Sequence, residues 1–145
     1  MARMISKTKT SGLNRSAASA APLDVSAYGD LTNWPRSWMG LEKDLPPGEA
    51  LLACLRPFIE YLASSTLSPK TIRRHVNNLW MLGGEIIRRL HYDPALRKQS
   101  AELLIRNAVY EDGGPLIHNG SEEEQRSFDA TCRKLHRFLT QAPRP

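Results

Sequence analysis

The stretch that decides the fold is residues 68–91, which read SPKTIRRHVNNLWMLGGEIIRRLH. Ser68 is a typical N-cap residue, and Pro69 falls at the first helical position, where its missing N–H costs nothing. Large apolar residues then recur at alternating spacings of three and four, which is the period of one helix face. Gly83 lies on that apolar stripe, so we expect a close approach by another helix there. The pattern predicts a long amphipathic helix that begins at Ser68.

Helical signals continue on both sides of this stretch. A helix is predicted from near Pro47 to about residue 63, and Pro57 inside it leaves two alternatives: a kink there, or a start near Pro57. Asp93 and the proline after it predict a third helix, which would end at the Gly-Gly-Pro of 113–115. Ser121 followed by Glu124 is a capping box and predicts a fourth. We find no alternation typical of strands, so the predicted fold class is all-α, with four to five helices.

The remainder of the chain is poorer in core-forming residues. Residues 1–26 are of low complexity and predict a disordered basic arm, although the acid-free first 23 residues also match the composition of a transit peptide. Residues 27–47 form an irregular lead-in rich in Trp and Pro, in which Trp34 and Trp38 are expected to be packing anchors. The predicted helical domain is 48–140.

The positive charge of the chain is concentrated. The net charge is +5 and the isoelectric point about 9.5, a balance that fits a polyanionic partner and says nothing about fold. Between residues 68 and 91 there are five Lys or Arg and a single acid, Glu85. Nucleic acid is therefore the partner that the charge distribution favours, and a merely solvated helix face is the alternative.

A helical wheel at about 100° per residue separates the long helix into two faces. The apolar stripe occupies one face, and Lys, Arg and Asn residues occupy the other. Arg and Lys neutralise phosphates, Asn can read an adenine edge, and the helix N-terminus offers free N–H donors. The predicted DNA-binding residues are Lys70, Thr71, Arg73, Arg74, Asn77, Asn78 and Arg88.

Other chemistry is poorly represented. Cys54 and Cys132 both lie in apolar helical stretches, which favours two buried thiols in a reducing compartment over a disulfide. There is no clustered Cys or His for a metal and no nucleotide-binding or hydrolase motif, so we expect no metal, no cofactor and no catalytic residue. No apolar run reaches the length of a membrane span. We expect a cytoplasmic protein without a membrane partner.

One segment carries a family resemblance. Phe58, Tyr61 and Leu62 end the first predicted helix, and Ser68 and Thr71 open the next. This arrangement resembles the core-binding, SAM-like N-terminal domain of tyrosine recombinases, the phage-type integrases. The segment 132–139 is similar to the last helix of that domain, and the resemblance covers roughly 48–140. It implies a SAM-like bundle that clamps one side of double-stranded DNA at a recombination site.

The chain departs from that family in its catalytic residues. The recombinases use a His-x-x-Arg pair and a nucleophilic Tyr, whereas no histidine here is followed by Arg three positions later. The resemblance therefore implies a non-catalytic DNA-binding accessory or stand-alone core-binding domain of DNA integration and recombination, or the remnant of a longer recombinase. Its partners would be double-stranded DNA and a separate recombinase or a second copy of itself.

An alternative function is a helical protein-interaction module that docks on a separate recombinase or regulator, because SAM-like folds serve both uses. Its signature would be an exposed apolar patch around Trp80 and Met81, or around Trp34 and Trp38.

Overall fold

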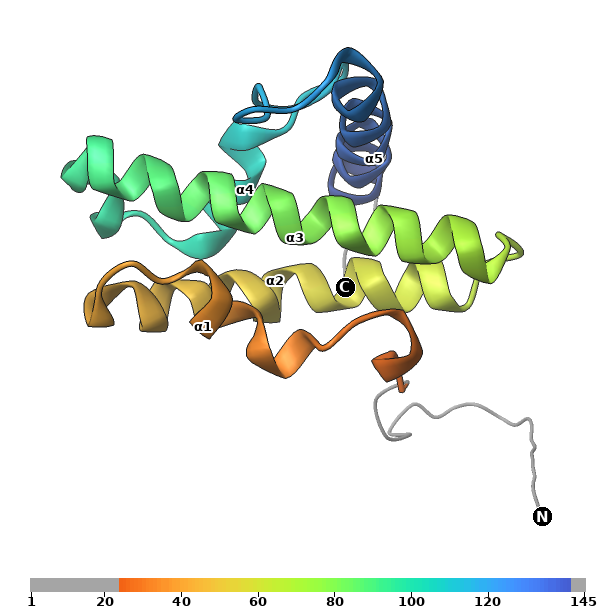
Figure 1. Ribbon diagram of the computed structural model, residues 1–145, viewed down its shortest axis with the longest axis horizontal. Coiled ribbons are helices and arrows are strands. Elements are labelled where there is room, and N and C mark those ends of the chain that lie inside the picture. The colour runs from red at the N-terminus through yellow and green to blue at the C-terminus, as the bar shows by residue number, and fades with distance from the viewer. Residues whose placement is uncertain (1–23, 142–145) are drawn as a thin grey trace.

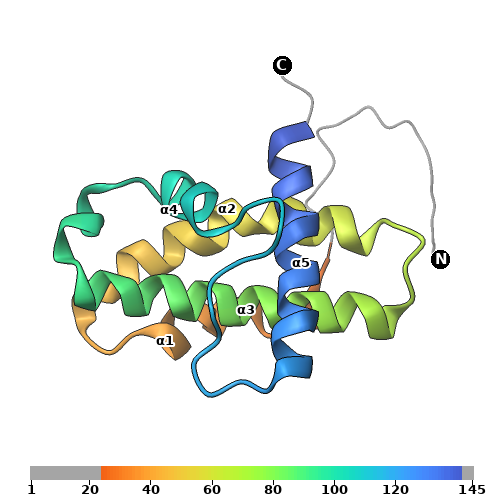
Figure 2. The ribbon, with the colours of Figure 1, turned by 90° about the horizontal axis from the view of Figure 1, so that it is seen from above.

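The computed structural model describes residues 24–141, so most of the predicted arm at 1–26 lies outside the described residues. Helices α2 (Leu45–Ala63) and α3 (Pro69–Tyr92) lie antiparallel and form a long hairpin (Figure 1). Helix α5 (Glu122–Gln141) crosses this hairpin at a steep angle (Figure 2). The short α4 (Ala101–Ala108) packs against the hairpin, mainly against α2. The fold is all-α, and the described residues contain no strand, only an isolated bridge between Tyr110 and Gly113.

Helix α3 begins as predicted. The Ser68 hydroxyl accepts a hydrogen bond from the Thr71 N–H at 3.1 Å, which satisfies one of the free donors of the first turn. The apolar stripe of α3 is buried against α2 and α5, with Val76 and Leu79 fully inaccessible to solvent. The periodicity therefore predicted both the helix and its buried side.

Helix α2 is one continuous helix in spite of its internal proline. It starts at Leu45, with two prolines in its first turn, and it runs through Pro57 to Ala63. Pro57 and Ala53 both lie on the exposed side of the helix. Pro57 removes the helical partner of the Ala53 carbonyl, and on the exposed side of a helix water can replace that partner at a lower cost.

The lead-in is more ordered than predicted. It contains three short 3-10 turns, Ser26–Tyr28, Leu31–Asn33 and Glu42–Asp44, and the five-residue helix α1 (Trp34–Trp38). Both tryptophans are buried, which confirms them as packing anchors. The approach expected at Gly83 is made by the Trp38 ring, because a Cβ at Gly83 would overlap that ring. The Trp38 indole N–H also donates to the Trp80 carbonyl at 2.9 Å.

A buried carboxylate joins the lead-in to the far end of α3. Asp44 is fully buried and accepts hydrogen bonds from the Gly40 and Leu41 N–H groups at 2.8 and 2.9 Å. Arg97 and His91 contact its two oxygens at 2.7 and 2.8 Å. Burial alone would raise the pKa of Asp44, but the hydrogen bond from Arg97 and those from the backbone and His91 hold it well below 3.8. The Asp44 network thus anchors the start of α2 to α3.

The third predicted helix is wrong in its bounds. Asp93 makes no side-chain cap, and the proline after it opens only the 3-10 helix Pro94–Lys98. Gln99 is extended, and the true cap is Ser100, whose hydroxyl accepts from the Leu103 N–H at 3.1 Å. Helix α4 then ends at Ala108, ahead of the predicted glycines. The cap of α4 is therefore formed by Ser100, seven residues after the Asp93 that the sequence predicted.

The last helix confirms its capping box. The Ser121 N–H donates to the Glu124 carboxylate at 2.8 Å, and the Glu124 N–H donates to the Ser121 hydroxyl at 3.0 Å. Helix α5 buries Phe128, Cys132 and Leu135 where it crosses the hairpin.

Candidate nucleic-acid interface

Four of the predicted DNA-binding residues lie exposed on one face of the first third of α3. They are Lys70, Arg73, Arg74 and Asn77. Thr71 is half-buried, and its hydroxyl oxygen accepts a hydrogen bond from the Ser68 hydroxyl at 3.0 Å, so it belongs to the cap of the same helix end. This end of the hairpin projects beyond α5 (Figure 2). The sequence prediction and the fold therefore bring five of the seven residues together.

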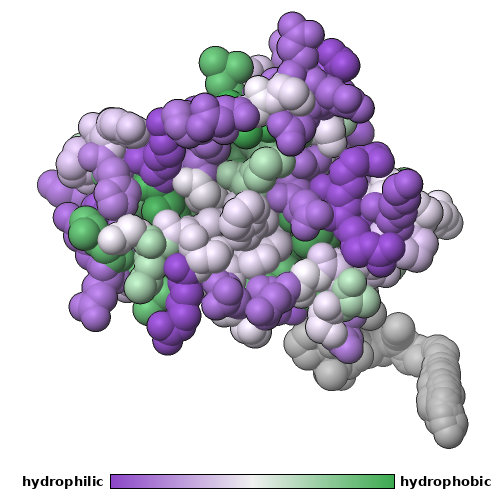
Figure 3. All heavy atoms as spheres, in the orientation of Figure 1, coloured by the Kyte–Doolittle hydropathy of each residue, from purple (hydrophilic) through white to green (hydrophobic). Residues whose placement is uncertain are grey.

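The charges of this helix end are not neutralised within the described residues. Residues 61–84 contain no acidic residue. In the part of the chain that the structure describes, none of Lys70, Arg73 and Arg74 takes part in an ion pair. In Figure 3, hydrophilic side chains cover this end of the molecule, while a paler band crosses its middle. A polyanion would find three unpaired cations within about one helical turn.

Asn78 does not belong to this surface, and its prediction as a DNA contact is wrong. Its side chain is 5% exposed, and its amide donates to the Thr131 hydroxyl at 2.8 Å. The same amide also donates to the Ser127 carbonyl and hydroxyl at 3.2 and 3.1 Å. The wheel placed Asn78 with the other polar residues of the helix, but α5 packs against its side chain.

Arg88 is exposed but stands apart from the other cations. It lies on the same face of α3, about 21 Å along the axis from Arg74 at 1.5 Å per residue. Its guanidinium is 3.6 Å from the Glu85 carboxylate, 3.4 Å from His118 and 5.2 Å from the centre of the Tyr92 ring. The contacts of Arg88 and Glu85 with His118 hold the 115–120 connection against α3, and Glu85 offsets the charge of Arg88. The structure does not bring Arg88 together with the first third of α3.

A buried polar cluster lies directly beneath the cationic end. His75 is 5% exposed, and its Nδ1 is 2.7 Å from the Thr131 hydroxyl. The Thr131 oxygen accepts from the Asn78 amide, and its hydroxyl donates to the Ser127 carbonyl at 3.4 Å. Burial, with the nearby charges of Lys134 and Arg74, lowers the pKa of His75 to about 4. The junction of α3 and α5 is therefore a neutral hydrogen-bonded network.

Sequence reasoning missed the cations of α5 next to this junction. Lys134 is half-exposed and Arg137 is exposed, and neither forms an ion pair within residues 24–141. The signal that would have found them is the absence of acid from residues 130–141, a run that also contains Arg133 and His136. In a net charge over the rest of the chain, the acids at 122–124 and 129 offset these cations, so the remainder is close to balanced.

The patch expected for a protein-interaction module is present only in part. Trp34 and Trp38 are 6% and 9% exposed, so they are not a docking surface. Trp80 is 40% exposed beside the half-buried Met81, and its indole N–H donates to the Ser37 hydroxyl at 2.8 Å.

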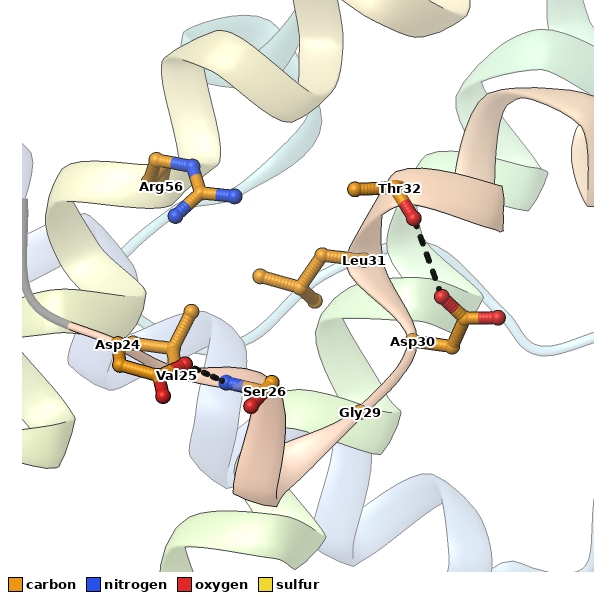
Figure 4. Close-up of a pocket in the computed structure, with 8 residues that line it drawn as sticks. All are labelled: Asp24, Val25, Ser26, Gly29, Asp30, Leu31, Thr32 and Arg56. Carbon is orange, nitrogen blue, oxygen red and sulfur yellow. Dashed lines mark hydrogen bonds between the residues drawn. The ribbon is translucent and has the colours of Figure 1, made fainter.

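A separate hollow of about 560 Å³ lies between the first 3-10 turns and α2 (Figure 4). Its polar side chains serve their own segments: Asp24 accepts from the Ser26 N–H at 3.0 Å, and Asp30 accepts from Thr32 at 3.2 Å. Such bonds to the residue two positions on are typical of turn formation. The lining residues are Asp24, Val25, Ser26, Gly29, Asp30, Leu31, Thr32 and Arg56.

Two further findings concern residues 24–141 as a whole. No helix there combines the length and hydrophobicity that crossing a membrane requires. Nowhere in the same described range do three His, Cys, Asp or Glu side chains gather as a metal centre needs.

No protein-family model matches the chain, and neither a curated protein nor a solved structure matches it.

Proposed function

We propose that this protein is a DNA-binding accessory with no reaction of its own, a stand-alone domain related to the core-binding domains of tyrosine recombinases. It would serve DNA integration or recombination in the cytoplasm, where its two cysteines stay as thiols. The observation that carries the proposal is the set of three exposed, unpaired cations on the projecting end of α3: Lys70, Arg73 and Arg74.

The proposed binding mode follows from the chemistry of this end. Lys70, Arg73 and Arg74 contact phosphates, and the helix dipole adds positive potential at the same place. Asn77, one turn further along the exposed face, is in position to donate to and accept from a base edge in the major groove. The phosphate contacts thus fix the position of the protein on the duplex, and Asn77 provides the preference for particular base pairs.

The family resemblance supports this mode through packing. Phe58 and Tyr61 from the resembling motif pack against Phe138 of α5, with ring centres 5.2 and 5.1 Å apart. Ser68 and Thr71 form the cap of the helix that carries the cations. The motif residues therefore hold the helix end that we propose to meet the duplex. The absence of a His-x-x-Arg pair from these 145 residues is the reason to propose binding without strand transfer.

The test is a fluorescence-anisotropy titration of the full chain with a labelled duplex at several salt concentrations. Replacing Lys70, Arg73 and Arg74 by Glu abolishes binding while the circular dichroism and thermal melting stay unchanged. A matched variant removes three exposed cations elsewhere: Arg36, Arg89 and Lys98. It retains most of the affinity. Equal affinities for the two triple variants would refute the proposal, and so would a wild-type affinity that does not change with salt concentration.

A second candidate, the protein-interaction module, is favoured by one observation, the 40% exposure of Trp80 beside Met81. Its partner would be a separate recombinase or a second copy of this chain. Sedimentation analysis of wild type and Trp80→Ala distinguishes the case of a second copy. Self-association that the substitution removes, together with no salt-dependent DNA binding, would favour this candidate over the first.

A further inference from the structure

We propose that α5 supplies a second row of phosphate contacts, Lys134 and Arg137, so that duplex DNA lies in the corner between α5 and the tip of the α2–α3 hairpin. This inference rests on the proposed DNA binding and extends it to a second helix. The corner is formed where α5 crosses the hairpin and the tip, residues 61–74, continues beyond the crossing (Figure 2).

One edge of α5 is already occupied by the connection that precedes it. Gln125, Asp129 and Arg133 follow each other at spacings of four and so lie on one edge of the helix. All three are hydrogen-bonded to the 112–117 segment at 2.8 to 3.3 Å. The connection therefore covers this edge and leaves the opposite edge of α5 to face the hairpin tip.

The opposite edge leads from the polar junction to Lys134, and Arg137 lies three residues beyond Lys134 on the outer face of α5. Ser127 and Thr131 on this side contact α3, and Lys134 follows Thr131 by three residues, which places it one turn further along the same side. The pKa of His75 responds to Lys134 from α5 and to Arg74 from α3. One cation from each helix therefore lies near the same buried ring.

Packing fixes the direction in which α5 continues. Phe138, one turn after Lys134, packs against the rings of Phe58 and Tyr61 at the end of α2. Arg137 precedes Phe138 directly and is exposed. Aromatic contacts therefore hold the cationic half of α5 across the neck of the hairpin, with Lys134 on the side of its tip and Arg137 exposed on the outer face.

The charge pattern of the corner indicates what fills it. The two segments that form it, 61–84 and 130–141, contain no acidic residue, although the chain has 15 Asp and Glu. Bringing two acid-free cationic segments together costs folding free energy through repulsion. A polyanion whose charges run past both segments offsets that cost, and a duplex backbone has this geometry.

The experiment compares three forms of the full chain in the salt-dependent anisotropy titration: wild type, Lys134→Gln with Arg137→Gln, and a control with Arg89→Gln and Lys98→Gln. The control removes the same charge away from the corner: Arg89 lies about 22 Å along the axis of α3 from Arg74, and Lys98 lies in the 3-10 helix that follows α3. For the α5 variant we expect the slope of log K against log salt to fall by about 1.8, because each lost phosphate contact removes about 0.9. For the control we expect little change.

The outcomes separate this inference from the proposed function. If the α5 variant keeps the wild-type slope and affinity while the α3 triple variant loses binding, the proposed function stands and the corner is refuted. If the wild type does not bind duplex, both fail. Thermal melting of each variant checks the fold, and a loss of binding counts only where the melting temperature is kept. If the double variant melts at a lower temperature than wild type, the single Arg137→Gln variant is used, because Arg137 is exposed and lies outside the buried junction. Its slope of log K against log salt should then fall by about 0.9.

Discussion

Acidification is expected to destabilise this protein through His75. The folded-state pKa of His75 is about 4, against an ordinary value of 6.5, because the ring is buried and near two cations. In the unfolded chain the ring takes up a proton below pH 6.5, whereas the folded chain resists it until about pH 4. The stabilisation is therefore fully present above pH 6.5 and is lost progressively as the pH falls toward 4. Each tenfold difference in proton affinity is worth about 1.4 kcal/mol, so the total is about 3 kcal/mol.

Urea denaturation of wild type and His75→Gln between pH 7 and pH 4.5 measures this contribution. A Gln amide can donate to or accept from the Thr131 hydroxyl but does not take up a proton in this pH range, so the variant keeps the junction and loses the linkage. As the pH falls across that range, the unfolding free energy of wild type should drop relative to that of His75→Gln by most of about 3 kcal/mol. Carboxylates that titrate in both proteins cancel in the difference. Two parallel stability curves would refute the reasoning, as would an NMR titration that finds the His75 ring protonated in the folded protein near pH 6.5.

Two core features give further predictions. Gly83→Ala should lower the unfolding free energy by about 1–3 kcal/mol in urea denaturation, since its Cβ would overlap the Trp38 ring; an unchanged midpoint would show that the ring moves freely. Asp44→Asn should cost about 3 kcal/mol at pH 7, because it leaves Arg97, whose side chain is 18% exposed, without its anion. The pKa of Asp44 lies below 3.8, so the carboxylate stabilises the fold above that pH, and the stabilisation is lost below it. The unfolding free energies of wild type and Asp44→Asn, measured by calorimetry, should therefore converge at low pH. A difference between them that stays constant with pH would contradict this prediction.

The parts of the fold that sequence predicted are those set by short-range chemistry. The Ser68 cap and the Ser121 capping box each involve residues three positions apart, and both are formed. Asp93 was also a local signal, but Ser100 is the better cap in the folded chain, and local propensity could not rank the two. Gly83 was recognised as a contact point, while the identity of its partner, a ring 45 positions earlier, needed the tertiary structure.

The candidate site also combines features that follow from local sequence with features that depend on the tertiary structure. The exposed cations of α3 followed from the wheel, because a helix face is a local property. Asn78 was assigned to the wrong environment because nothing in its own helix says which neighbour packs against its edge. Lys134 and Arg137 lie about 60 residues further along the chain, and only the crossing of α5 over the hairpin brings them to the same corner.

The contact between Trp38 and Gly83 also sets how short a working fragment can be. A fragment that began at residue 48, the predicted start of the helical domain, would lack both Trp38 and Asp44. It would leave an unfilled notch at the two glycines of α3 and a guanidinium at Arg97 without its carboxylate. Such a fragment would expose fresh apolar surface and be prone to associate, so a shortened form for binding or crystallisation work should begin no later than Val25, the first buried residue described.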